Sequence, residues 1–111
     1  MAIFSTHLLN SVDGSHANNV NIQIHKIDKN NYKSLFMKEC TDENGRLLKE
    51  FDLSKEDCES DYEMLIDLGN YFKIDNIINF VSIKFKMKQN QKKYHIPLII
   101  SPNGYSVWWS K

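Results

Sequence analysis

The sequence predicts an all-β protein, a sandwich of two sheets built from seven or eight strands with one short helix. Apolar residues recur at every second position in several segments, which is typical of strands with one buried face. Turn-forming residues separate these segments at intervals of about ten residues, as in sandwich folds. With 111 residues, of which 41% are hydrophobic, the chain can enclose one modest core. We therefore expect a single domain over residues 1–111.

Four strands are expected in the first half of the chain. The first covers residues 4–10. The second covers residues 20–27, where valine and isoleucine alternate with polar residues until the phase is lost at the end. Shorter strands are expected over residues 32–39 and 46–51. The Asn44-Gly45 pair before the last of these is the strongest hairpin signal in the chain.

In the second half we expect strands at residues 62–67, 81–87, 96–100 and 105–109, and a short helix at residues 68–74. The strand at residues 81–87 alternates apolar residues with serine and lysine, so one face is buried and the other solvated. Pro97 has no amide donor, which favours an edge strand or a bulge at that point. The acidic segment at residues 56–63 is interpreted as a solubilising loop that leads into a strand.

The charge pattern argues against a polyanionic or membrane partner. Formal net charge is zero and the pI is about 6.9. A lysine stripe on one strand is typical of a solvated face, so we expect no nucleic-acid partner. No apolar run is long enough for a membrane span and the first residues show no secretory signal. Cys40 and Cys58 lack metal-binding spacing and are expected to be reduced thiols of a cytoplasmic protein.

Arg46 is the only arginine among fourteen basic residues, and it directly follows the Asn44-Gly45 turn. Lysine suffices where only charge is needed, so a single arginine points to use of its planar five-donor fork. In one interpretation the fork binds a carboxylate of the same turn, Asp42 or Glu43. In the other it recognises a planar anion or amide-like edge with two parallel hydrogen bonds.

Two of the four histidines lie in or directly beside predicted strands near the two ends of the chain, His7 and His95. Each is either a strand histidine with a satisfied ring or a neutral imidazole that can take a proton from water. His16 and His25 are interpreted as surface residues. The histidines show no HxxxH or HxH spacing, so no metal site is predicted, although His7 and His95 could in principle share a metal once the chain is folded.

Four segments resemble, in order, the motifs of one family. Ser5-Thr6-His7-Leu8-Leu9-Asn10 is similar to an opening strand written "STHVLD", and residues 18–27 are similar to the strand that follows it. Residues 41–46 resemble a "TNxDGR" turn, and residues 94–106 resemble the signature "YHVPLLLSPxGYST". The chain is thereby identified as a member of the transthyretin-like family, in the branch of the 5-hydroxyisourate hydrolases of purine breakdown.

This resemblance implies a transthyretin-like (prealbumin-like) sandwich that assembles as a homotetramer, a dimer of dimers, with active sites between subunits. It also implies hydrolysis of 5-hydroxyisourate to 2-oxo-4-hydroxy-4-carboxy-5-ureidoimidazoline in urate degradation, without a cofactor. The hydrolases carry the three polar residues that here are His7, Arg46 and His95, whereas hormone-carrying transthyretins have replaced them. We expect one histidine to be the general base, the other an orienting partner or acid, and Arg46 to hold the substrate.

The chain departs from this family pattern at its end. The hydrolases typically end in Tyr-Arg-Gly-Ser, whereas this chain ends in Trp108-Trp109-Ser110-Lys111. Trp108 takes the place of a tyrosine that contacts substrate, with a larger ring, an N–H donor and no hydroxyl. Two alternatives to the enzyme follow: a non-catalytic transthyretin-like protein that binds a small ligand at this aromatic end, or a structural partner protein.

Overall fold

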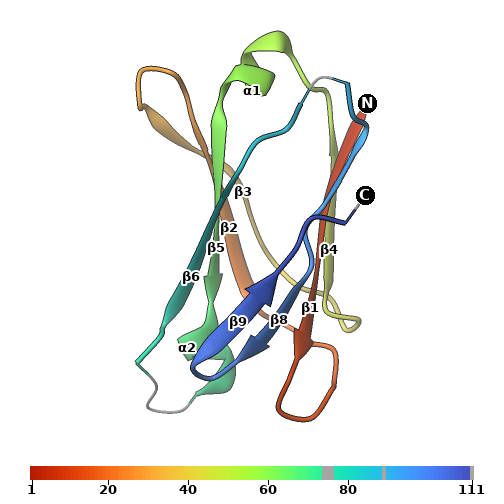
Figure 1. The fold of residues 1–111 in the computed structure, drawn as a ribbon, viewed down its shortest axis with the longest axis vertical. Helices are drawn as coiled ribbons and strands as arrows, with labels where there is room; N and C mark the ends of the chain where they lie inside the picture. Colours follow the sequence, from red (N-terminus) through yellow and green to blue (C-terminus); the bar gives the residue numbers. More distant parts are fainter. Residues whose placement is uncertain (74–76, 89, 111) are drawn as a thin grey trace.

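The computed structural model describes residues 1–73, 77–88 and 90–110 and shows two sheets packed face to face (Figure 1). The first sheet contains, in order, β4 (Arg46–Phe51), β1 (Ala2–Asn10), β8 (Leu98–Ser101) and β9 (Gly104–Val107), and β7 (Lys93–His95) also pairs with β1. The second contains, in order, β3 (Lys33–Cys40), β2 (Asn21–Ile27), β5 (Asp61–Asp67) and β6 (Phe80–Phe85). The two-sheet sandwich predicted from the sequence is confirmed.

Most predicted strands begin and end within two residues of the observed ones. The strand predicted at residues 46–51 coincides with β4, and that predicted at 62–67 differs from β5 by one residue. Two predictions need correction. The strand predicted at residues 81–87 ends at Phe85, although Met87 beyond it is fully buried. The strand predicted at residues 96–100 begins only at Leu98, as β8, and a separate short strand, β7, ends before it at His95.

The division at Pro97 lies inside the first sheet. β7 and β8 both run parallel to β1 in one register, with Ser5 opposite His95 and Leu8 opposite Leu98. Pro97 cannot donate to the ladder between them. The buried Thr6 hydroxyl donates instead to the carbonyl of the preceding residue, Ile96, at 2.6 Å. The irregularity predicted at Pro97 is therefore present, and it leaves His95 held against β1.

The core lies between the sheets and is filled by alternate residues of the strands. Its largest fully buried apolar side chains include Phe4, Leu8, Ile22, Ile24, Met64, Ile66, Leu98 and Ile100. Aromatic rings join the two sheets: Phe85 of β6 stacks on Phe4 of β1, with ring centroids 5.3 Å apart. Because a one-residue slip would expose this set, core packing fixes which face of each strand points outward.

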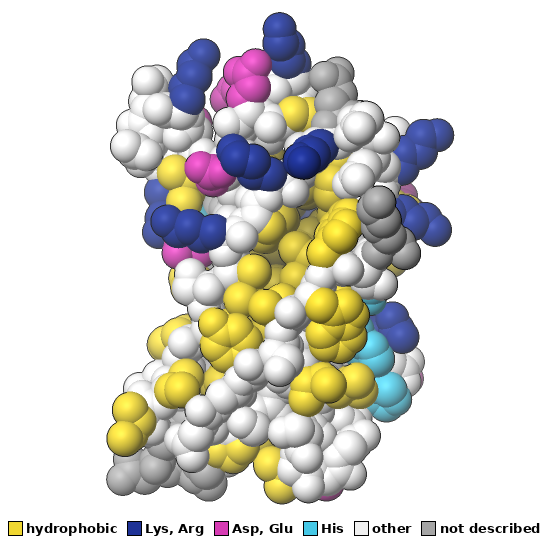
Figure 2. All heavy atoms as spheres, viewed as in Figure 1, with side chains coloured by type: hydrophobic (Ala, Val, Ile, Leu, Met, Phe, Trp, Pro, Cys, Tyr) yellow, Lys and Arg dark blue, Asp and Glu magenta, His cyan; other side chains and the backbone are white. Residues whose placement is uncertain are grey.

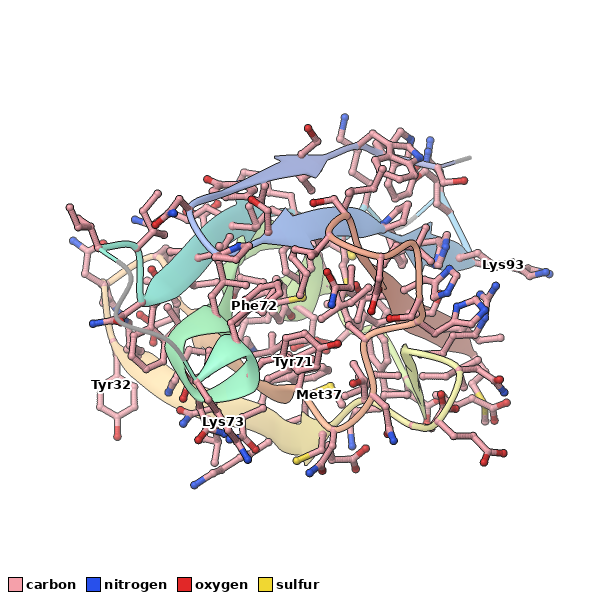
Figure 3. The ribbon with its side chains drawn as sticks, turned by 90° about the horizontal axis from the view of Figure 1, so that it is seen from below. Tyr32, Met37, Tyr71, Phe72, Lys73 and Lys93 are labelled. Carbon is pink, nitrogen blue, oxygen red and sulfur yellow. The ribbon has the colours of Figure 1, made fainter. Side chains whose placement is uncertain are left out.

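The short helix α2 (Leu68–Phe72) confirms the helix predicted over residues 68–74, of which Ile74 lies outside the described residues. Asp67 caps it by accepting the backbone N–H of Asn70 at 3.0 Å. Figure 3 shows Tyr71 and Phe72 directed toward the interior, and both pack against the core. In the same view Tyr32 and Lys93 point outward.

A second short helix, α1 (Lys55–Glu59), shows that the interpretation of residues 56–63 as loop and strand is wrong in its first part. The Ser54 hydroxyl accepts the N–H of Asp57, and the Asp57 carboxylate accepts the N–H of Ser54. This reciprocal capping box requires only the Ser-x-x-Asp spacing, so the sequence contained the signal.

Within the described ranges, neither helix is long enough to cross a bilayer. Both cysteines are free, as predicted.

Candidate active site

The outward face of the first sheet brings the three predicted polar residues together. Alternate residues of β1 fill the core, so Ser5 and His7 project from the opposite face. The β1–β4 ladder places His7 opposite Arg46, and the β1–β7 ladder places Ser5 opposite His95. Figure 2 shows histidine side chains gathered beside a basic side chain at the right-hand edge of the molecule. Residues from both ends of the chain therefore share one surface.

A depression of about 430 Å³ lies on this face. Arg46, His95 and Ser5 contribute polar groups to its lining, and Ile3 and Leu48 contribute apolar ones. His7 flanks the depression without lining it, because its ring contacts a loop residue instead. The volume and the mixed lining are those of a site for a small molecule.

His95 is held by Ser5, the residue opposite it in the ladder. The Ser5 Oγ lies 2.8 Å from His95 Nδ1. Burial lowers the pKa of His95, the positive charge of Arg46 lowers it further, and a backbone hydrogen bond at Ser5 opposes both. Among the described residues, Nε2 of this ring has no hydrogen-bond partner. The lowered pKa therefore favours the neutral ring, and His95 lines the depression.

Arg46 does not form the turn ion pair that one interpretation of the sequence predicts. The Asp42 carboxylate accepts the backbone N–H groups of Asn44 and Arg46, each at 2.9 Å, and these bonds lower the pKa of Asp42. The ion pairs found between described residues involve only lysines. The side chain of Arg46 is exposed, so its guanidinium can bind an anion or a carbonyl edge at the depression.

The position of Arg46 depends on the close approach of Gly45 to β1. Gly45 has a φ of 70°, and its carbonyl accepts the N–H of Leu8 at 2.8 Å. A Cβ at this position would lie 2.5 Å from the Leu8 carbonyl oxygen and 3.0 Å from the backbone nitrogen of Ala17. Only glycine fits both the conformation and the space, which explains why the Asn44-Gly45 signal precedes Arg46.

His16 is exposed, as predicted, but it also contacts the site, which the sequence interpretation missed. Its Nδ1 lies 3.0 Å from His7 Nε2. Burial lowers the pKa of His7 most, followed by the charges of Arg46 and His16. The Asp13-Gly14 turn could have indicated that this loop folds back on β1. No residue spacing could have shown that the two rings meet.

His25 lies on the outward face of β2, as interpreted from the sequence, but it is not fully exposed. Its side chain is half-buried on β2, and its Nδ1 is buried without a hydrogen-bond partner in the described part of the chain. This strand belongs to the second sheet, away from the depression.

Across residues 1–73, 77–88 and 90–110, no group of three or more His, Cys, Asp or Glu residues is arranged to hold a metal ion.

Trp108 does not line the depression that contains Arg46 and His95. It lines a separate apolar depression together with Ile83, Phe85, Lys86, Ile96, Val107 and Trp109. Its backbone N–H donates to the carbonyl of Pro97 at 3.3 Å, and that of Ser110 donates to the carbonyl of His95 at 3.0 Å, so the tail runs beside β7. Both tryptophans are 44% exposed. Within one chain, Trp108 therefore lines a different depression from Arg46 and His95.

Comparison with known proteins agrees with the fold and the motifs. Residues 4–109 match the model of the HIUase/Transthyretin family. A 5-hydroxyisourate hydrolase of Halalkalibacterium halodurans is 26% identical over 94% of this chain and 93% of that protein. A probable 5-hydroxyisourate hydrolase of Caenorhabditis elegans is 30% identical over 96% and 80%, respectively.

Among solved structures, an (S)-allantoin synthase superposes with a TM-score of 0.83 at 22% identity. The match covers 99% of this chain and 44% of that one, and it supports the fold alone. The family model, in contrast, spans almost every residue of the sandwich, including both ends of the candidate site. This chain therefore belongs to the HIUase/Transthyretin family.

Proposed function

We propose that the protein is a 5-hydroxyisourate hydrolase and acts in urate degradation, a part of purine breakdown. The observation that carries this proposal is the meeting of His7, Arg46 and His95 on one face of the first sheet. Relatives from bacteria and a nematode that cover most of the chain bear this name. The substrate is an oxidised purine with an electrophilic ring carbonyl, and no cofactor is required.

His95 is assigned as the general base. Ser5 binds its Nδ1, and the lowered pKa keeps the ring neutral, so the lone pair of Nε2 can take a proton. As Nε2 removes a proton from water, the water oxygen bonds to the ring carbonyl carbon. The tetrahedral intermediate then collapses, the C–N bond breaks, and the His95 imidazolium returns its proton to the leaving nitrogen. His95 thus carries one proton of the water molecule to the leaving nitrogen of the product.

Arg46 is assigned to bind the carbonyl oxygen of the substrate, where negative charge develops as water attacks. A guanidinium that has no intramolecular ion pair among the described residues can donate two N–H bonds that converge on such an oxygen. His7 lies opposite Arg46 in the ladder and is assigned as the orienting partner, because its Nε2 is already engaged by another ring.

We further propose a cytoplasmic homotetramer, a dimer of dimers with sites at the subunit interface. The depression is open on one chain, and apolar side chains are exposed on the same face: Leu48 is 59% and Ile99 38% exposed. A second copy over this face would bury these side chains and exclude water from the site. Trp108 remains a proposed substrate contact, made only in the assembled protein. Free cysteines fit a reducing compartment.

The decisive experiment follows the decay of freshly generated 5-hydroxyisourate by absorbance, with and without protein. We expect the protein to accelerate decay, and His95→Ala to reduce the catalysed rate by about 10²–10⁴-fold with unchanged circular dichroism. His25→Ala is the matched control, because it removes a histidine from the second sheet and should leave the rate unchanged. Retention of substrate without turnover would instead indicate a binding protein. No acceleration and no binding would contradict both functions.

A further inference from the structure

Two histidines form a hydrogen-bonded pair beside the proposed site. His7 Nε2 lies 3.0 Å from His16 Nδ1, with the ring centroids 5.1 Å apart and 27° between the ring planes. A neutral imidazole has one donor nitrogen and one acceptor nitrogen. A bond between two such rings therefore joins the N–H of one to the lone pair of the other. The hydrolytic steps assigned above do not involve His16.

The backbone holds His16 in this position. The loop after β1 folds back on it: the Ser15 carbonyl accepts the N–H of Asn10 at 2.8 Å, and the Leu8 carbonyl accepts that of Ala17 at 2.9 Å. His16 lies between these two bonds and forms an antiparallel bridge with Leu9. The position of its ring therefore follows from main-chain pairing, and the contact is more than a meeting of two free surface side chains.

The charged and titratable groups around the pair come from three segments. Arg46 lies on β4, His95 on β7, and Asp42 in the turn before β4, and each interacts electrostatically with His7. A backbone hydrogen bond at Asn44 raises the pKa of His7, which is the effect of a carbonyl that accepts an N–H from the ring.

These contacts favour one tautomer of His7. Nε2 is occupied by the contact with His16, so Nδ1 is the ring nitrogen left to donate to the Asn44 backbone. With the proton on Nδ1, Nε2 carries the lone pair, and His16 must be the donor. The other tautomer would direct an Nδ1 lone pair at a carbonyl oxygen, placing two acceptors against each other.

We propose that His16 is a positioning residue of the hydrolase site: it donates its Nδ1–H to His7 Nε2 and holds His7 in the neutral Nδ1–H tautomer. The proposal rests on the proposed function in that His7 belongs to that site. With both ring nitrogens occupied, His7 does not compete with His95 for the proton of water. It also stays uncharged near Arg46, so the guanidinium is the positive charge closest to the developing oxyanion.

The tautomer can be measured without substrate, by long-range proton–nitrogen NMR correlation of the imidazole rings in nitrogen-labelled full-length protein. Above the titration range of the histidines, wild-type His7 should show a protonated Nδ1 and an unprotonated Nε2. His16→Ala should decrease this tautomer and raise the midpoint of the His7 titration. His16→Asn retains an amide N–H donor near the place of Nδ1 and cannot titrate, so it should restore the tautomer. His25→Asn is the matched control and should leave the His7 signals unchanged.

Activity provides a second readout. His16→Ala should lower kcat/KM roughly tenfold by releasing His7, and His16→Asn should return it to within about twofold of wild type. An Nε2–H tautomer in wild-type His7, or an unchanged tautomer in His16→Ala, would overturn the proposal. So would His16→Asn that restores the tautomer but not kcat/KM. A tautomer lost in His16→Ala and restored in His16→Asn supports the pairing even if wild type does not hydrolyse 5-hydroxyisourate, so the two proposals fail separately.

Discussion

Arg46 lies directly opposite His7 in the antiparallel ladder between β1 and β4. Opposite residues of such a ladder present their side chains on the same face, with Cβ atoms about 4.5–5.5 Å apart. Strand pairing, and not a bond between the two side chains, therefore places the guanidinium and the imidazole on one face. Because neither side chain is needed for the ladder itself, each can be replaced without loss of the fold, and its contribution to catalysis can be measured alone.

Arg46→Lys tests the need for the planar fork. Lysine keeps the positive charge but cannot donate two parallel hydrogen bonds in a fixed geometry. We expect kcat/KM for 5-hydroxyisourate to fall roughly 10²-fold, the scale of losing one oxyanion donor. Steady-state kinetics provide the measurement, with the urea midpoint as the control for folding. Undiminished activity would mean that Arg46 is only a turn residue.

The assignment of His95 as base predicts how kcat/KM depends on pH. Only the neutral imidazole accepts a proton, so the rate should be level near neutral pH and fall as pH decreases through the pKa of His95. Burial and Arg46 lower this pKa, so the midpoint should lie below the ordinary histidine value of about 6.5. In Arg46→Gln the residual activity should show a higher midpoint, because the neighbouring charge is gone. A wild-type midpoint above 6.5 would contradict the assignment.

The sequence predicts well those elements whose signal lies within a few neighbouring residues. Alternation at Ile22 and Ile24, and again from Val81 to Phe85, follows from burying one face of a strand, and a window of a few residues contains it. The division of the strand at Pro97 is different. At this break the Thr6 hydroxyl donates a hydrogen bond to the Ile96 carbonyl. The two residues are 90 positions apart, so no local pattern encodes the contact.

For the site, the motifs identify His7, Arg46 and His95, because the chemistry of these side chains and their place in the motifs are visible in the sequence. The state of each ring is not visible there. Whether a ring nitrogen is free depends on Ser5 for His95 and on His16 for His7, and both contacts arise only when separate segments pair with β1. The sequence thus predicts the members of the site, whereas the assignment of the base requires the fold.

The missed helix α1 gives a test of local stability. Ser54→Ala removes the side chain that accepts the Asp57 N–H, and it should lower the free energy of unfolding by about 1 kcal/mol. Ser54→Asn is the control, because asparagine is an equally good N-cap residue and should stay close to wild type. Urea unfolding followed by fluorescence provides the measurement. Equal losses in both variants would show that the hydroxyl itself, and not helix capping, stabilises this segment.

Gly45 and Gly14 form a matched pair for testing how the turn positions Arg46. Both have positive φ, 70° and 76°, so replacing either with alanine should cost about 1–2 kcal/mol from backbone conformation alone. A Cβ at Gly14 meets no atom within 4 Å, whereas one at Gly45 would lie 2.5 Å from the Leu8 carbonyl oxygen.

Gly45→Ala should therefore destabilise the protein more than Gly14→Ala, because β1 and the turn must move apart to admit the methyl group. The same movement displaces Arg46 from its place opposite His7, so kcat/KM should fall in Gly45→Ala molecules that remain folded and stay near wild type in Gly14→Ala. Urea unfolding and steady-state kinetics on both variants measure the two effects. Equal stability losses with unchanged kinetics would show that the approach of Gly45 to β1 does not position the guanidinium.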